Sequence, residues 1–152
     1  MTSAISKAWE EVLRPMLLRP KRVQVAALCF RETDTGKDVL LITSRGTGRW
    51  IVPKGWPIDG MGGSEAALRE AWEEAGVREA RVQRAPIGSY GYSKVLDNGA
   101  SAPIETQVYL AQVCEMSDTY PEAPERQRRW VTAEEAANMV DEPGLQDILR
   151  AI

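Results

Sequence analysis

The chain has 152 residues, of which 43% are hydrophobic and 27% charged. This composition is typical of a globular domain that buries an apolar core and stays soluble. Its net charge of −3 argues against a broadly basic nucleic-acid-binding surface. It contains no histidine, which excludes histidine-based nucleophilic catalysis and histidine-ligated zinc. No apolar run is long enough to span a membrane. Lys7, Glu10 and Glu11 interrupt any signal-peptide core, so we expect a cytoplasmic protein.

An opening helix is predicted over residues 1–19, because apolar residues recur there at helical spacing until Pro15 and Pro20. Its apolar stripe is typical of packing against the domain or against a partner subunit. A homodimer is therefore one possibility that this helix leaves open.

Strands rich in apolar and β-branched residues follow, separated by turns that contain glycine or proline. The predicted strands are 22–31, 39–45, 49–55, 80–95, 105–114 and 128–132. Cys29 and Cys114 lie in two of these runs, which indicates reduced core residues and not a disulfide. Helices are predicted over 64–75, 133–140 and 143–152, the second capped by Thr132. This alternation predicts one mixed α/β domain over residues 1–152.

The helix predicted over residues 64–75, "SEAALREAWEEA", is unusually acidic on one side. Ser64 is its expected N-cap and Gly76 its expected end. The expected buried stripe is Leu68, Ala71, Trp72 and Ala75, with Glu70, Glu73 and Glu74 on the opposite face. Arg69 is placed to pair with Glu73, whereas Glu70 and Glu74 repel each other at i, i+4. A solvated acidic face is one interpretation, and coordination of a hard divalent cation is the other.

The longer pattern from Gly55 to Val77 resembles the Nudix box, G-x5-E-x7-R-E-U-x-E-E-x-G-U. Two positions depart from it: Ala71 is small for the aliphatic position, and Met61 replaces the first glutamate. The segments 22–31 and 39–55 look like the diphosphoinositol polyphosphate phosphohydrolase branch of this family. The resemblance covers residues 20–140 and implies an α/β/α sandwich around a central mixed sheet.

The resemblance also implies chemistry. Nudix enzymes hydrolyse pyrophosphate bonds with Mg²⁺ or Mn²⁺, and the resemblance assigns the metal to Glu70, Glu73 and Glu74, oriented by Arg69. Divalent metals neutralise phosphoryl oxygens and lower the pKa of a bound water, which is what a stable phosphoanhydride requires.

Cations near the box are candidates for binding substrate phosphates. In the inositol branch, basic residues at the positions of Arg22, Arg45 and Arg49 face the substrate. Lys54 replaces a glycine common in that branch and is a further candidate. The alternative is that these are ordinary surface residues at strand ends.

Glycine and aromatic residues complete the expected substrate site. Gly55 lets the backbone approach the acidic helix closely. Trp56 lies beside the box and is the leading candidate to stack on a base, ahead of Tyr90 and Tyr92. Trp130 is expected to pack against the terminal helix instead.

Glu105 stands where the inositol branch carries a positive charge, which weakens the inositol assignment. It is either an additional metal ligand or base, or an exposed glutamate at a strand end. Asp59 and Glu65 are further candidates to compensate in part for the glutamate missing at position 61.

We therefore predict a Mg²⁺-dependent pyrophosphohydrolase acting on a diphosphoinositol polyphosphate or a dinucleoside polyphosphate, with no nucleic-acid or membrane partner. The alternative is a degenerate Nudix domain that binds a nucleotide or phosphorylated ligand without turnover, for which Met61 is the sequence support. A purely structural acidic domain leaves the glycine loop and the acidic helix together unexplained.

Overall fold

The apolar run that follows residue 21 forms β1 (Arg22–Thr33), the central strand of the fold. The computed structural model describes residues 22–152, so the predicted opening helix lies outside the described residues. From Val25 to Phe30 every residue of β1 is buried, which is what an uninterrupted apolar strand between two layers requires.

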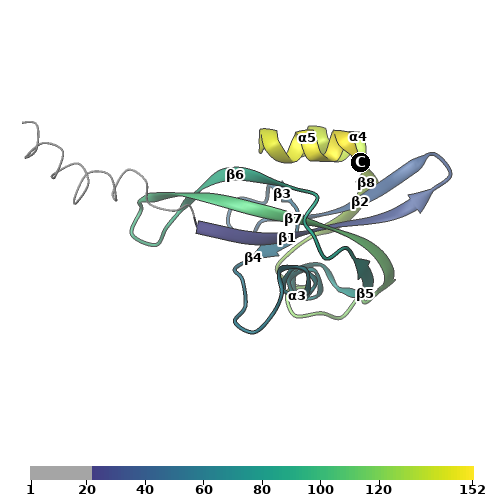
Figure 1. The fold of residues 1–152 in the computed structure, drawn as a ribbon, viewed down its shortest axis with the longest axis horizontal. Coiled ribbons are helices and arrows are strands. Elements are labelled where there is room, and N and C mark those ends of the chain that lie inside the picture. Colours follow the sequence, from purple (N-terminus) through teal and green to yellow (C-terminus); the bar gives the residue numbers. More distant parts are fainter. Residues whose placement is uncertain (1–21) are drawn as a thin grey trace, which may run out of the picture.

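The remaining strands surround β1 in one mixed eight-stranded sheet (Figure 1). They are β2 (Gly36–Thr43), β3 (Trp50–Ile51), β4 (Lys54–Gly55), β5 (Val77–Val82), β6 (Gly88–Val95), β7 (Ser101–Met116) and β8 (Arg128–Thr132). The main path is β3-β2-β1-β7-β5, with β4 on β1, β6 on β7 and β8 on β2. β1 and β7 run parallel, and every other pairing is antiparallel.

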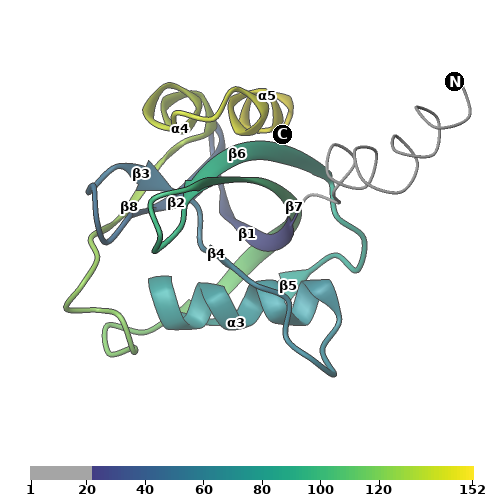
Figure 2. The same cartoon turned by 90° about the vertical axis from the view of Figure 1, so that its left-hand side faces the viewer.

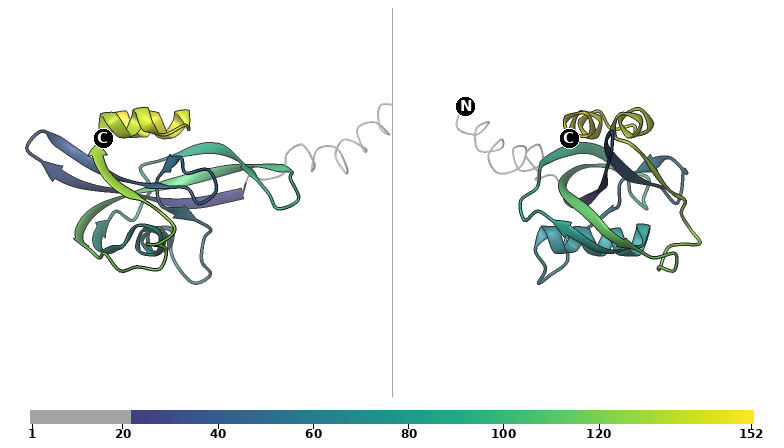
Figure 3. Two further views of the ribbon diagram at one scale, coloured as in Figure 1. Left: turned by 180° about the vertical axis from the view of Figure 1, so that it is seen from behind. Right: turned by 90° about the vertical axis from the view of Figure 1, so that its right-hand side faces the viewer.

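Helices cover both faces of the sheet. α3 (Gly63–Ala75) lies on one face, whereas α4 (Ala133–Met139) and α5 (Pro143–Ala151) lie side by side on the other (Figures 2 and 3). Two apolar clusters fill the spaces between these layers. None of the helices within residues 22–152 has the length and apolar content of a membrane span. The predicted α/β/α sandwich with a mixed sheet is confirmed.

Most element boundaries follow the sequence, and the exceptions have local causes. The strand predicted over 80–95 is two strands, β5 and β6, separated around Pro86. The strand predicted over 49–55 divides into β3 and β4 at Pro53, because proline lacks the N–H that a ladder needs. Thr132 caps α4 as expected, accepting a 3.1 Å hydrogen bond from the Glu135 N–H.

Two side-chain placements differ from the sequence interpretation. Cys29 is buried, but Cys114 is exposed near the end of β7, so it is not a core residue. Trp130 packs in the cluster on the α3 side, with the Arg31 guanidinium 4.4 Å from its ring centroid. The expectation that it packs against the terminal helix is wrong, because strand alternation turns its neighbour Val131 toward α4 and α5 instead.

Candidate active site

The acidic helix α3 packs on the sheet through alanines. Its N-cap is Gly62, with no side-chain cap, so Ser64 is not the cap, and Gly76 ends the helix in the left-handed conformation as expected. Ala66, Ala67, Ala71 and Ala75 are buried, whereas Leu68 and Trp72 are only partly buried. These small side chains let the helix lie close to the sheet.

This packing buries one of the three glutamates. Glu74 is only 5% exposed, so the expectation that it projects away from the buried side is wrong. Leu68 and Trp72 instead flank a separate surface hollow that Met61 also lines. The large apolar residues therefore do not mark the centre of the buried face, which the alanines occupy.

A cleft of about 750 Å³ lies between α3 and the end of the sheet. Glu70, Glu73 and Glu74 line it from α3. It is also lined by most of the predicted substrate-binding residues: Arg45, Arg49, Lys54, Gly55 and Trp56. The fold thus places acidic and basic candidates around one solvent-accessible space.

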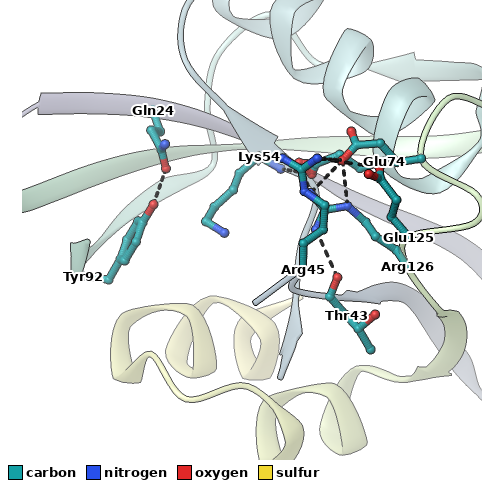
Figure 4. Close-up of polar contacts among 9 residues, drawn as sticks. Gln24, Thr43, Arg45, Lys54, Glu74, Tyr92, Glu125 and Arg126 are labelled. Carbon is teal, nitrogen blue, oxygen red and sulfur yellow. Dashed lines mark hydrogen bonds and ion pairs between the residues drawn. The ribbon is translucent and has the colours of Figure 1, made fainter. Parts of the chain in front are cut away.

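Glu74 is held by two groups within this cleft. Its Oε1 lies 3.5 Å from an Arg126 guanidinium nitrogen, and its Oε2 accepts a 3.4 Å hydrogen bond from the backbone N–H of Lys54. Burial raises the pKa of the Glu74 carboxyl to about 7, against the lowering effect of Arg126. Figure 4 shows Arg126 beside Glu74, with the Lys54 side chain between this pair and Tyr92.

Glu70 lies against the backbone of β4. A Cβ atom built on Gly55 would overlap the Glu70 carboxylate, so only glycine leaves room for it. Burial, followed by the charges of Glu73 and Glu122, raises the pKa of the Glu70 carboxyl to about 7. The box glycine and the box glutamate therefore form one close contact.

Arg69 takes a smaller part than the resemblance implies. Its guanidinium lies 3.9 Å from Glu73, which confirms the predicted i, i+4 pair. Its side chain is half exposed and lies outside the cleft lining. Within residues 22–152 it forms no ion pair with Glu70 or Glu74.

The arginines of the cleft are engaged by carboxylates. Arg45 lies 3.4 Å from Glu122 and 3.6 Å from Glu125. Arg49 lies 2.5 Å from Glu142, a residue that is only 7% exposed. A phosphate would have to compete with these carboxylates for either arginine.

Lys54 is a cation of a different kind. Its ammonium lies 5.4 Å from the centroid of the Tyr92 ring, and burial lowers its pKa to about 8. It has no carboxylate within ion-pair distance among the described residues.

Two of the predicted site residues, Arg22 and Glu105, lie away from the main cleft. Arg22 lines an adjoining hollow of about 440 Å³, which shares Trp56 and Lys94 with the cleft. Glu105 lines neither space and accepts a 3.2 Å hydrogen bond from the Ser89 hydroxyl. The structure thus does not bring Glu105 together with the box glutamates.

The aromatic candidates separate by exposure. Tyr90 is 4% exposed and lies within the core beside α5, so it has no face for a ligand. Tyr92 lines the cleft and donates its hydroxyl hydrogen to Gln24 Oε1. Trp56 is 40% exposed, and the Lys94 ammonium lies 5.0 Å from its ring centroid. Trp56 and Tyr92 are therefore the aromatic surfaces that the cleft offers.

The sequence interpretation missed Arg126 and Glu122, which both line the cleft. They lie in the connection between β7 and β8, which the sequence marks only as a proline-containing loop. The Glu122 N–H donates a 2.9 Å hydrogen bond to the Glu73 carbonyl, and this places the loop on α3. No local pattern signals this contact.

The carboxylates of the cleft suit a divalent cation that keeps part of its water shell. Among the described residues no three carboxylate or thiol groups converge on one point. Magnesium usually binds through one or two carboxylates and completes its shell with waters and substrate phosphates. Glu70 and Glu74, one helical turn apart on the cleft wall, fit that requirement, and the space that Gly55 leaves admits the Glu70 carboxylate.

Comparison with known proteins identifies the family. A family model described as the NUDIX domain matches residues 20–152. The chain belongs to the Nudix family. Nudix hydrolase 16, mitochondrial, of Arabidopsis thaliana is 32% identical to it over 84% of this chain and 77% of that protein. Human diphosphoinositol polyphosphate phosphohydrolase 3-alpha is 32% identical over 77% of this chain and 68% of that protein.

Solved structures share the fold of this Nudix hydrolase. A C. elegans Ap4A hydrolase in a binary complex superposes with a TM-score of 0.68 at 21% identity, covering 85% of this chain and 93% of that one. The NUDIX domain of Shewanella oneidensis NrtR, complexed with ADP ribose, gives 0.63 at 19% identity and 94% coverage of both. The family match and the named curated relatives make this chain an enzyme, a hydrolase of phosphoanhydrides.

Proposed function

We propose that this Nudix hydrolase is a Mg²⁺-dependent pyrophosphohydrolase whose metal-binding residues come from the acidic helix: Glu70 and Glu74, which fit the requirement of the metal, and the neighbouring Glu73. The observation that supports the proposal is the cleft itself, where a wall of carboxylates on α3 faces Lys54, Arg45 and Arg49. A metal-bound phosphoanhydride needs both kinds of partner, carboxylates for the metal and cations for its outer phosphates.

The carboxylates of the cleft are assigned to the metal, and its cations are assigned to the phosphates of the substrate. When bound, the metal neutralises phosphoryl charge and lowers the pKa of a water molecule. Glu70 and Glu74 hold it on the helix side. Lys54, which has no carboxylate partner among the described residues, is the cation ready to contact a phosphate oxygen. Arg45 and Arg49 reach a phosphate by giving up Glu122 and Glu142.

The cleft favours a nucleoside-containing substrate over a diphosphoinositol polyphosphate. Within residues 22–152, the cleft cations without a carboxylate partner are Lys54 and Lys94, and both lie over aromatic rings. Two such cations suit a short phosphate chain better than a densely phosphorylated ring. Trp56, two-fifths exposed, offers a face on which a base can stack. We therefore infer a dinucleoside polyphosphate type of substrate.

A non-catalytic binder is the alternative. It rests on Met61, the methionine at the first glutamate position of the box. Met61 packs beside Leu68 in a hollow on another side of α3 and does not line the cleft. The carboxylates that do line it are retained, and this supports turnover.

The test is hydrolysis by the purified protein with Mg²⁺ or Mn²⁺ across two substrate classes, diadenosine polyphosphates and diphosphoinositol polyphosphates. We expect turnover of the dinucleoside class, lost in Glu74→Gln. Metal binding without turnover of either class would support the binder instead.

A second variant separates the substrate classes. Stacking on an aromatic side chain is worth about 1–3 kcal/mol per base. Trp56→Ala should therefore raise KM for a diadenosine polyphosphate by roughly 5- to 150-fold. A diphosphoinositol polyphosphate has no base, and its KM should not change. Equal losses for both classes would remove Trp56 as a base-binding residue.

The cytoplasmic location and the homodimer remain predictions from the sequence. Sedimentation of the purified chain tests the second directly.

A further inference from the structure

Arg126 is among the most buried charged residues of the cleft, with a side chain only 7% exposed. Its Nε and one terminal nitrogen donate to the same oxygen of Glu122, at 3.2 and 3.0 Å. Its other terminal nitrogen donates to the Thr43 carbonyl at 3.0 Å. The guanidinium is therefore fixed by partners from its own loop and from β2.

This anchored guanidinium presents its positive charge to Glu74. The distance from its terminal nitrogen to Glu74 Oε1 is 3.5 Å, and both side chains are almost completely buried. The backbone N–H of Lys54 donates a hydrogen bond to the other oxygen of the Glu74 carboxylate. Both oxygens of Glu74 are thus oriented by groups that do not belong to α3, and a planar guanidinium holds such a geometry better than an ammonium.

Arg69 lacks these properties. It is half exposed, it lies on the same helix as its partner, and it reaches Glu73 at 3.9 Å. An exposed i, i+4 pair of this kind contributes little to fixing a side chain.

We propose that Arg126, and not Arg69, is the positioning residue that holds Glu74 of the metal-binding helix in place. Arg45 supports it from outside through Glu122, which joins the box helix, the loop before β8 and the turn after β2 in one charged network. The inference rests on the proposed function, in which Glu74 is a metal ligand.

The experiment measures Mn²⁺ binding by calorimetry or by electron paramagnetic resonance, without substrate, together with Tm. Outer-shell partners of metal ligands are typically worth about 10- to 100-fold in affinity. Arg126→Met should therefore raise the Mn²⁺ Kd by about that factor. Arg126→Lys should recover part of the affinity, because an ammonium restores the positive charge but not the planar set of N–H donors of the guanidinium.

Arg128→Met is the matched structural control. Arg128 ties the same loop to the end of α3 through the Ala75 and Ser117 carbonyls, at 2.9 and 2.7 Å, yet it contacts no box carboxylate. We expect this variant to lower Tm while its Mn²⁺ Kd stays close to that of the wild type.

The outcomes distinguish the two proposals. If the wild-type protein binds Mn²⁺ and Arg126→Met binds it equally well, the positioning role is overturned and the metal site stands. If Arg128→Met loses as much affinity as Arg126→Met, the effect is general loosening of the loop, which also overturns the role. Wild-type protein that binds no Mn²⁺ overturns the metal site together with this inference.

Discussion

The carboxylate of Glu70 occupies the space that a side chain at position 55 would fill. Gly55 is not among the glycines of the described residues with a positive φ, so its backbone does not require glycine. The requirement comes from the close approach of β4 and α3. The glycine that opens the box and the glutamate fifteen residues later are thus two sides of a single contact.

Gly55→Ala tests that contact. The added methyl displaces the Glu70 carboxylate, and overpacking of this kind costs about 1–3 kcal/mol. We expect a lower Tm and a lower kcat at saturating Mg²⁺. Gly91→Ala is the control, since a Cβ there meets its nearest atom at an ordinary 3.8 Å. Wild-type activity in Gly55→Ala would show that Glu70 does not need its observed position.

Glu74→Gln tests the metal ligand itself. The amide keeps the shape of the side chain but loses the charge, while Arg126 retains Glu122 as a partner. Turnover should fall by more than about 100-fold, because even outer-shell groups are worth about 10- to 100-fold. Circular dichroism should show an unchanged fold. Near-normal kcat at saturating Mg²⁺ would refute the assignment.

The pH dependence of metal binding follows from the raised pKa values of Glu70 and Glu74, both about 7. A carboxyl must lose its proton to bind a cation. Mn²⁺ affinity should therefore increase as the pH rises through about 7 and then level off. An affinity that is flat between pH 5.5 and 8 would contradict these pKa values.

The stability of the metal-free protein should change in the opposite direction. The folded state retains protons on Glu70 and Glu74 up to a pH of about 7, whereas the unfolded chain releases them near the ordinary value of 4.5. Their contribution to the free energy of unfolding is fully present below that lower value and is lost as the pH rises through about 7. Urea titrations at several pH values measure this contribution in the wild type and in the Glu70→Gln/Glu74→Gln double variant. If the free energy of unfolding changes equally with pH in both proteins, these two groups are not its source.

Arg49 and Glu142 allow stability to be separated from substrate binding. Arg49→Met leaves Glu142 buried without its partner, and since Arg49 is one-third exposed we expect a loss of about 1–3 kcal/mol. The double variant with Glu142→Gln should regain most of that stability. If Arg49 also binds phosphate, KM stays high in the double variant. A KM that returns to the wild-type value would remove Arg49 from the substrate site.

Met61→Glu tests whether this departure from the box matters for chemistry. Met61 is partly buried against the α3 cluster, so a charged side chain should lower stability by about 0.5–3 kcal/mol. Because it lies outside the cleft, kcat/KM per folded molecule should be unchanged or higher. A large fall in kcat with unchanged Tm would connect this position to catalysis after all.

The features that the sequence predicted are those that local patterns determine. The apolar run of β1, the acidic helix, its end at Gly76 and the Arg69–Glu73 pair each depend on residues a few positions apart. The division of residues 80–95 into β5 and β6 also has a local cause, Pro86, although the apolar pattern alone predicts one strand.

The burial of Glu74 and its partner Arg126 had no such signal. The large side chains Leu68 and Trp72 suggested a buried face that excludes Glu74, but small alanines let the helix lie closest to the sheet on another side. Arg126 reaches Glu74 across more than fifty residues of sequence, through a loop that only the assembled fold positions. Pairing of the cleft arginines with Glu122 and Glu142 depends on the same assembly.

The parallel pairing of β1 with β7 joins residues more than half a chain length apart. During synthesis, β1 therefore emerges long before its main partner, and that edge of β1 stays unpaired until β7 has been made. Non-local pairing of this kind slows folding. Arg126 follows β7 in the chain, so Glu74 gains its buried ion-pair partner only after that later loop has been made. The capacity to hold a metal should accordingly appear only after the loop between β7 and β8 has been synthesised and has docked on α3.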